Sequence, residues 1–187
     1  MTTPPLLIGL TGPIGAGKDT AAAYLEDQYA FCVTAFAEPI LDMLGALAQH
    51  VDVDGAWLTE RVLKEQPLPV LGRSYRQLAR SLGDQWGRYG FGMHWWVNIV
   101  DHKWIQAHQR GDNLVITDVR YANEAAWLAR NGGTLVGLQR DGCEFAPLAH
   151  ESELQASQLK PHHIITNNGS REHLYDKLEV LIARLRG

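Results

Sequence analysis

The segment from Gly12 to Thr20, which reads GPIGAGKDT, constrains this chain more than any other feature. An apolar run, Leu6–Leu10, precedes it, and a helix-like stretch rich in alanine follows it. Strand, glycine-rich turn and helix in this order form the context in which the pattern G-x-x-x-x-G-K cradles phosphate groups. Glycines let backbone N–H groups turn toward anionic oxygens, and the helix N-terminus adds partial positive charge. We therefore predict a phosphate-binding loop whose lysine, Lys18, offers a point charge to the outer phosphates of a nucleotide.

One position of this loop departs from the usual pattern. Asp19 stands where a Ser or Thr hydroxyl would hold Mg²⁺, and Thr20 comes one residue later. We expect Asp19 or Thr20 to take part in metal binding. The alternative is a glycine turn that binds no ligand. The loop residues predicted to bind ATP are Gly12, Ile14, Gly15, Ala16, Gly17, Lys18, Asp19 and Thr20.

Composition excludes several classes of function. A formal net charge of -4 over 187 residues gives no global attraction to nucleic acid or to acidic membranes. No apolar run approaches the roughly 18 residues of a membrane span, and no signal peptide is apparent at the N-terminus. Cys32 and Cys143 lack metal-ligand spacing and are interpreted as idle thiols. We expect a cytoplasmic protein with no membrane or nucleic-acid partner.

Strand-like and helix-like runs alternate along the chain, which predicts an α/β fold with a parallel five-stranded sheet and flanking helices. With the phosphate loop after the first strand, the pattern predicts a fold of the P-loop nucleoside triphosphatase type, in a single domain over residues 1–187. The helices expected first and last lie at residues 17–29 and 171–186. The expected strands lie at residues 6–10, 31–36, 113–118, 134–138 and 163–166.

About 75 residues separate the second expected strand from the third, far more than a simple crossover needs. We interpret residues 39–107 as a helical insertion that binds an acceptor, broken internally at Pro67 and Pro69. Arg73, Arg76 and Arg80 have helical spacing, so we expect them to share one face. That face is either solvated or binds a nucleoside monophosphate, since arginine suits planar phosphate contacts.

Asp118 ends an apolar strand and is the candidate for holding Mg²⁺ or orienting an attacking oxygen. Arg120 follows two residues later, where it can grip a phosphate or form an ion pair with Glu124. Residues 140–160 are interpreted as a lid-like segment in which Arg140 covers the transferring phosphate. After the fifth strand, the segment Asn168, Gly169 and Ser170 either contacts adenine or caps the last helix.

Taken together, these motifs resemble the bacteriophage-type deoxynucleoside monophosphate kinases over nearly the whole chain. The family's expected Lys after Pro39 is absent, and Tyr75 also departs from the pattern, which leaves the choice of base open. The matching segments are Gly17–Thr20, Phe36–Pro39, Arg76–Leu78, Gly83–Arg88, Thr117–Arg120 with Asn123 and Glu124, and His150–Glu153.

The resemblance implies transfer of the γ-phosphoryl group of ATP, with Mg²⁺, to a deoxynucleoside 5′-monophosphate, which can carry a modified base. It implies a host-cytoplasmic location if the protein is phage-encoded, and it leaves a homodimer open. The implied catalytic residues are Lys18, Asp118, Arg120 and Arg140; the implied metal-binding residues are Asp19, Thr20 and Asp118. The implied substrate-binding residues are Phe36, Arg73, Arg76, Gln77, Trp86, Arg88, Arg120, His150 and Glu153.

Three other functions stay open at this point. A kinase for another small molecule, such as dephospho-coenzyme A, shares a similar opening motif. A kinase acting on a modified base within DNA would need a basic groove, which only the arginine-rich stretch 73–88 could supply. A nucleotide-binding regulator would bind ATP without acceptor-stimulated turnover.

Overall fold

A computed structural model describes residues 4–60, 62–145 and 150–187 of the chain. The chain divides into two compact units, one formed by Met1–Phe36 with Ile99–Gly187 and the other by Ala37–Asn98. The second unit overlaps most of the stretch 39–107 that we interpreted as an insertion, and its acceptor-binding role stays a prediction. No helix among the described residues combines the length and the apolar character that crossing a membrane requires.

The first unit is built on a five-stranded parallel sheet with strand order β2-β3-β1-β4-β5, which confirms the predicted fold class. Two strands end earlier than expected: β2 stops at Thr34 and β3 at Ile116. The polar residues that follow are thereby left in loops at the carboxyl edge of the sheet, where ligands bind in open α/β folds. The strands are β1 (Leu7–Thr11), β2 (Phe31–Thr34), β3 (Asn113–Ile116), β4 (Thr134–Gln139) and β5 (His163–Thr166).

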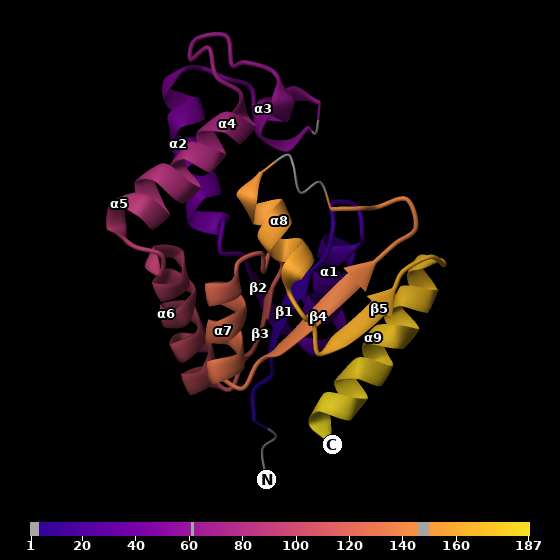
Figure 1. Ribbon diagram of the computed structural model, residues 1–187. Coiled ribbons are helices and arrows are strands. Elements are labelled where there is room, and N and C mark those ends of the chain that lie inside the picture. Colours follow the sequence, from indigo (N-terminus) through magenta and orange to yellow (C-terminus); the bar gives the residue numbers. More distant parts are fainter. Residues whose placement is uncertain (1–3, 61, 146–149) are drawn as a thin grey trace. The chain divides into compact units, whose positions relative to one another are not determined.

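Helices cover both faces of this sheet (Figure 1). Ile8 and Leu10 of β1 are fully buried in a core cluster with residues of α1 (Lys18–Tyr29) and α9 (Arg171–Arg186). Gly9 points to the opposite face, where a Cβ would lie 2.7 Å from Leu128 of α7 (Ala122–Arg130). This alternation is the period of a strand buried on both sides, so the glycine allows close approach of α7. The remaining helices of this unit are α6 (Trp95–Arg110), which starts in the second unit, and α8 (Glu151–Gln158).

The second unit is helical and packs around Trp96, which is 1% exposed. The indole Nε1 of Trp96 donates a hydrogen bond to the Gly83 carbonyl at 2.8 Å. A Cβ at Gly87 would lie 2.5 Å from the same ring, so this glycine makes room for the tryptophan. The elements are α2 (Glu38–His50), α3 (Ala56–Thr59), η1 (Leu63–Glu65), α4 (Tyr75–Arg80), the π-helix η2 (Ser81–Arg88) and α5 (Tyr89–Phe91).

Candidate active site

The phosphate-binding loop connects β1 to α1, and its glycines adopt conformations that other residues rarely reach. Gly12, Gly15 and Gly17 have φ values of 141°, 85° and 103°. At two of these positions a side chain would also collide with the neighbouring strands' ends. A Cβ at Gly12 would lie 2.3 Å from the Leu138 carbonyl oxygen, and one at Gly17 would lie 2.4 Å from Nδ2 of Asn167. Glycine is therefore required by both the backbone conformation and the packing.

Lys18 begins α1 and folds back over the loop. Its Nζ donates hydrogen bonds to the carbonyl oxygens of Gly12 at 2.7 Å and Pro13 at 2.9 Å. Burial lowers the pKa of Lys18 below 10.5, the positive charge of Arg120 lowers it further, and three carboxylates oppose the shift. These carboxylates belong to Asp19, Glu153 and Asp118. Charged residues from three segments, the first turn of α1, the loop after β3 and helix α8, thus act electrostatically on the lysine.

Asp118, expected as the last residue of a strand, lies two residues beyond the end of β3, and its carboxylate holds the turn after β2. Oδ1 accepts a hydrogen bond from the backbone N–H of Phe36 at 2.7 Å. The Phe36 side chain is 2% exposed and meets Trp127 edge to face, with ring centroids 6.0 Å apart. We expected Phe36 among the substrate-binding residues, but its ring is a packing element of the first unit. Burial leaves it no open face on which a base could stack.

Arg120 follows Asp118 and pairs with α8. Its Nη1 lies 3.3 Å from Oε1 of Glu153, whose side chain is 12% exposed. Glu124, which we considered as a partner for the Arg120 guanidinium, is 1% exposed and accepts the backbone N–H groups of Arg120 and Tyr121 at 2.8 and 3.0 Å. Glu124 therefore shapes the turn that carries Arg120, while Glu153 meets its charged end.

His150 and Glu153 stand at the start of α8, within the predicted lid-like segment. The Nδ1 of His150 accepts the backbone N–H of Ser152 at 3.2 Å, so His150 caps this helix. That bond occupies one ring nitrogen of His150, and the substrate-binding role expected for this residue stays a prediction. Positions 146–149 of the predicted lid lie outside the described residues.

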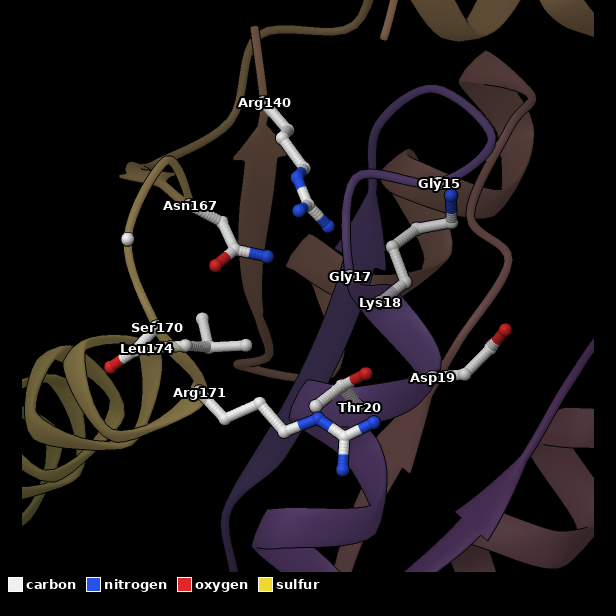
Figure 2. A pocket seen from close by; sticks show the side chains of 11 residues that line it. Gly15, Gly17, Lys18, Asp19, Thr20, Arg140, Asn167, Ser170, Arg171 and Leu174 are labelled. Carbon is white, nitrogen blue, oxygen red and sulfur yellow. The ribbon is translucent and has the colours of Figure 1, made fainter.

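A cleft of about 530 Å³ extends from the phosphate loop to the first turn of α9 (Figure 2). The Arg140 side chain points into it toward the loop, and Arg171 reaches across toward Thr20. Asn168, predicted to contact ATP, does not line it; the preceding residue, Asn167, does. The lining residues are Gly15, Gly17, Lys18, Asp19, Thr20, Arg140, Asn167, Gly169, Ser170, Arg171 and Leu174.

Sequence reasoning missed three of these lining residues: Asn167, Arg171 and Leu174. Their positions directly after β5 and in the first turn of α9 were the available signal, because the carboxyl edge of a parallel sheet gathers such residues. The first turn of α9 is capped by Ser170, whose Oγ accepts the backbone N–H of His173 at 3.4 Å.

The arginines of the second unit do not share a single helical face. Helix α4 begins after the N-cap Ser74, so Arg73 precedes the helix. The prediction that Arg73 shares a helical face with Arg76 and Arg80 is therefore wrong. Arg76 forms an ion pair with Glu65. Gln77, a predicted substrate-binding residue, forms a capping box in which its Oε1 accepts the Ser74 N–H at 3.0 Å.

The end of the π-helix carries two further predicted residues with different environments. Arg88 is 7% exposed, and its Nε lies 3.4 Å from Oδ1 of Asp84. Trp86 is 40% exposed and meets Phe91 edge to face, with centroids 4.8 Å apart. Of the two side chains, only that of Trp86 is exposed to solvent.

Comparison with known proteins identifies the family. A family model described as deoxynucleotide monophosphate kinase matches residues 71–178, more than half of the chain. The chain belongs to this family. A curated protein of Acanthamoeba polyphaga mimivirus, whose name assigns it to the same kinases, is 30% identical over 186 aligned residues, covering 92% of this chain and 94% of that protein. The family resemblance seen in the sequence is thereby confirmed.

A shikimate kinase from Aquifex aeolicus shares the fold of this deoxynucleotide monophosphate kinase family member. The two structures superimpose with a TM-score of 0.53 at 10% sequence identity, covering 95% of this chain and 96% of that one. At this identity the similarity concerns the fold alone.

The donor set near the loop fits a magnesium ion bound together with a nucleotide. Mg²⁺ in kinase sites takes one or two carboxylates, several waters and the substrate phosphates, and it does not need an all-protein cage. The described residues contain no group of three or more His, Cys, Asp or Glu suited to a metal. Asp19 and Asp118 both act on the Lys18 charge, and Thr20 lines the cleft, so oxygen donors stand beside the phosphate loop.

Proposed function

We propose that this chain transfers the γ-phosphoryl group of ATP to the 5′-phosphate of a deoxynucleoside monophosphate. The bond between the γ-phosphorus and the β–γ bridging oxygen breaks, a bond to an acceptor phosphate oxygen forms, and ADP leaves. The observation that carries this proposal is the meeting of Lys18, Asp118 and the Arg120–Glu153 pair at a glycine-rich loop, in a member of the deoxynucleotide monophosphate kinase family.

The phosphate loop and Lys18 would hold the donor. Backbone N–H groups of the loop and the N-terminus of α1 offer partial positive charge to the β- and γ-phosphates. The Lys18 ammonium, now bonded to the carbonyls of Gly12 and Pro13, would move to phosphate oxygens, which are stronger acceptors because they are charged. Asp118, Asp19 and Thr20 are the residues that would hold Mg²⁺, which neutralises charge on the phosphates when bound.

Arginines would counter the repulsion between donor and acceptor. Two phosphate groups brought together away from bulk water repel strongly, so the site needs fixed positive charge. Arg120 would offer its guanidinium to a phosphate in place of Glu153, and Arg140 would approach from the cleft wall. Because phosphoryl transfer needs little covalent chemistry from the protein, positioning and charge neutralisation supply most of the catalysis.

We assign recognition of the acceptor to residues of the second unit. Arg73 is exposed and lies ahead of α4, and Trp86 is 40% exposed, so a base could stack on its exposed part. Arg76 and Arg88 would have to exchange a carboxylate partner, Glu65 or Asp84, for a phosphate. This assignment predicts that substitutions at Arg73 and Trp86 raise the KM for the acceptor and leave the KM for ATP unchanged.

An acceptor screen tests the function. Purified protein with Mg-ATP is incubated with dAMP, dGMP, dCMP, dTMP and base-modified deoxynucleoside monophosphates, and diphosphate formation is measured by chromatography. We expect acceptor-dependent ADP release with at least one of them. Lys18→Ala should abolish transfer while thermal unfolding stays within a few degrees of the wild type. Release of ADP with dephospho-coenzyme A and with none of the nucleotides would refute the assignment.

A further inference from the structure

Two consecutive asparagines after β5 form hydrogen bonds with two different loops of the candidate donor site. The buried side chain of Asn167 donates from Nδ2 to the Ala16 carbonyl of the phosphate loop at 3.0 Å, across 151 residues of sequence. The Asn168 Oδ1 accepts the backbone N–H of Asp141 at 2.9 Å. Asp141 directly follows Arg140, so one turn holds both the phosphate loop and the segment that carries the cleft arginine.

The turn itself is anchored to the sheet. The Asn167 backbone N–H donates to the Gln139 carbonyl at 2.7 Å, which continues the pairing between β4 and β5 by one residue. Because strand pairing fixes the backbone here, the Asn167 side chain has a defined origin from which to reach the loop. Gly17 leaves the necessary room, since a Cβ there would lie 2.4 Å from Nδ2.

The bond to Ala16 determines which way the next peptide N–H points. In a trans peptide the carbonyl and the N–H point in opposite directions. With the Ala16 carbonyl bound to Asn167, the N–H of Gly17 is directed away from Asn167. A carbonyl turned the other way would present a partial negative charge to phosphate oxygens, which would repel them.

We infer that Asn167 and Asn168 are positioning residues for the donor nucleotide, Asn167 acting through the Ala16–Gly17 peptide and Asn168 through Arg140. This inference rests on the proposed function, and it adds the claim that a single turn sets the spacing between the phosphate loop and the opposing arginine. Asn168 thus acts on ATP without lining the cleft.

The first experiment measures donor binding directly. Equilibrium titration of Mg-ATP, and separately of Mg-tripolyphosphate, is carried out with the wild type and Asn167→Ala. Loss of one buried hydrogen bond to the loop should raise both dissociation constants by about tenfold. Tripolyphosphate has no base or sugar. An equal increase in its dissociation constant would therefore show that Asn167 acts through the phosphate loop. If Asn167→Ala does not fold, Asn167→Ser is measured in its place.

Asn131→Ala is the matched control. The Asn131 side chain also donates from Nδ2 to a backbone carbonyl, that of Trp127, at 3.0 Å. It lies at the end of α7, before β4 begins, away from the carboxyl edge of the sheet. Its removal should lower the unfolding temperature without changing either dissociation constant. An equal loss of binding in Asn131→Ala and Asn167→Ala would reduce Asn167 to a structural role and overturn the inference.

A double-mutant cycle tests the proposed role of Asn168. Asn168→Ala should raise the dissociation constant for Mg-ATP by about two- to fivefold, as expected for one exposed hydrogen bond. In an Arg140→Ala background the same substitution should have no further effect, because Arg140 is the residue it positions. Additive effects in the cycle would overturn the role of Asn168.

These measurements need no acceptor, so they stand apart from the proposed reaction. A wild type that binds Mg-ATP yet phosphorylates no deoxynucleotide would refute the proposed function and still allow the positioning role to be judged. A wild type that phosphorylates deoxynucleotides, with an Asn167→Ala variant that binds tripolyphosphate normally, would refute the positioning role alone.

Discussion

The carboxylate of Asp118 accepts a hydrogen bond from the backbone N–H of Phe36 at 2.7 Å, so the loop after β3 holds the turn after β2. Asp118 therefore has a structural bond as well as the charge that we assign to metal binding. The two contributions can be separated, because an asparagine keeps an oxygen acceptor at the same position but carries no charge.

Asp118→Asn should lower kcat by about 100-fold or more, since it removes charge from the proposed metal site, while the free energy of unfolding changes by less than about 0.5 kcal/mol. Asp118→Ala should lower kcat as far and also destabilise the protein by about 1–2 kcal/mol, because the Phe36 N–H loses its acceptor. Denaturant unfolding and initial rates measure both effects. Equal stability of the two variants would contradict a structural role for this bond.

Donor binding should weaken at alkaline pH below the ordinary titration range of lysine. Burial and Arg120 lower the pKa of Lys18 in the free protein, whereas bound phosphates would favour the ammonium and raise that pKa again. ATP affinity is then full below the pKa in the free protein and falls as the pH rises through it toward 10.5. Titration calorimetry in buffers of different ionisation enthalpy should show proton uptake on ATP binding in the pH range where the affinity falls, which we call the alkaline limb. Lys18→Met should remove the pH dependence along with most of the affinity.

The same pKa shift affects folding in the opposite direction. A lowered pKa means that the folded chain loses the Lys18 proton before the unfolded chain does. Between the folded pKa and 10.5 the unfolded state binds more protons, so this group makes unfolding less favourable as the pH rises. Lys18 therefore costs stability at neutral pH, as charged groups held for function often do.

Glu153→Gln should move the alkaline limb of ATP binding to lower pH. The Glu153 carboxylate pairs with Arg120 and is one of the charges that raise the pKa of Lys18. Neutralising it leaves the arginine charge uncompensated, so the Lys18 ammonium becomes less favourable. Glu151→Gln, on the exposed side of the same helix, is the control and should leave the limb unchanged. If ATP affinity falls at the same pH in Glu153→Gln as in the wild type, this electrostatic coupling is contradicted.

Two glycine substitutions in the second unit should have opposite effects on stability. Gly87→Ala places a Cβ 2.5 Å from the buried Trp96 ring and should destabilise the protein by about 1–3 kcal/mol. Gly45 lies within α2 with nothing within 4 Å of the added Cβ. Gly45→Ala should therefore stabilise the protein by about 0.5–1 kcal/mol, since alanine is the better helix former. Thermal unfolding of both variants gives the measurement, and a stable Gly87→Ala would mean that Trp96 can be displaced at little cost.

Local patterns were sufficient to predict the loop, the parallel sheet and the family. The span Gly12–Lys18 lies between a strand-like run and a helix-like run, the context in which its spacing predicts a phosphate loop. The alternation of apolar runs with helical spacing admits few topologies. Asp118 could be located as well, because a carboxylate directly after an apolar strand falls at the carboxyl edge in any parallel sheet. These predictions depend on short-range geometry, which sequence spacing encodes.

Which side chain reaches which partner was decided by the tertiary structure. Asn167 and Asn168 are identical residues one position apart, yet the buried one meets the phosphate loop and the exposed one meets Asp141. The Ser74 cap placed Arg73 outside its helix, and packing against Trp127 enclosed the Phe36 ring. No local pattern distinguishes these outcomes, because they depend on contacts between segments far apart in the chain. The sequence by itself determined a phosphate loop in a parallel sheet, and only the folded chain decided which residues hold that loop in place.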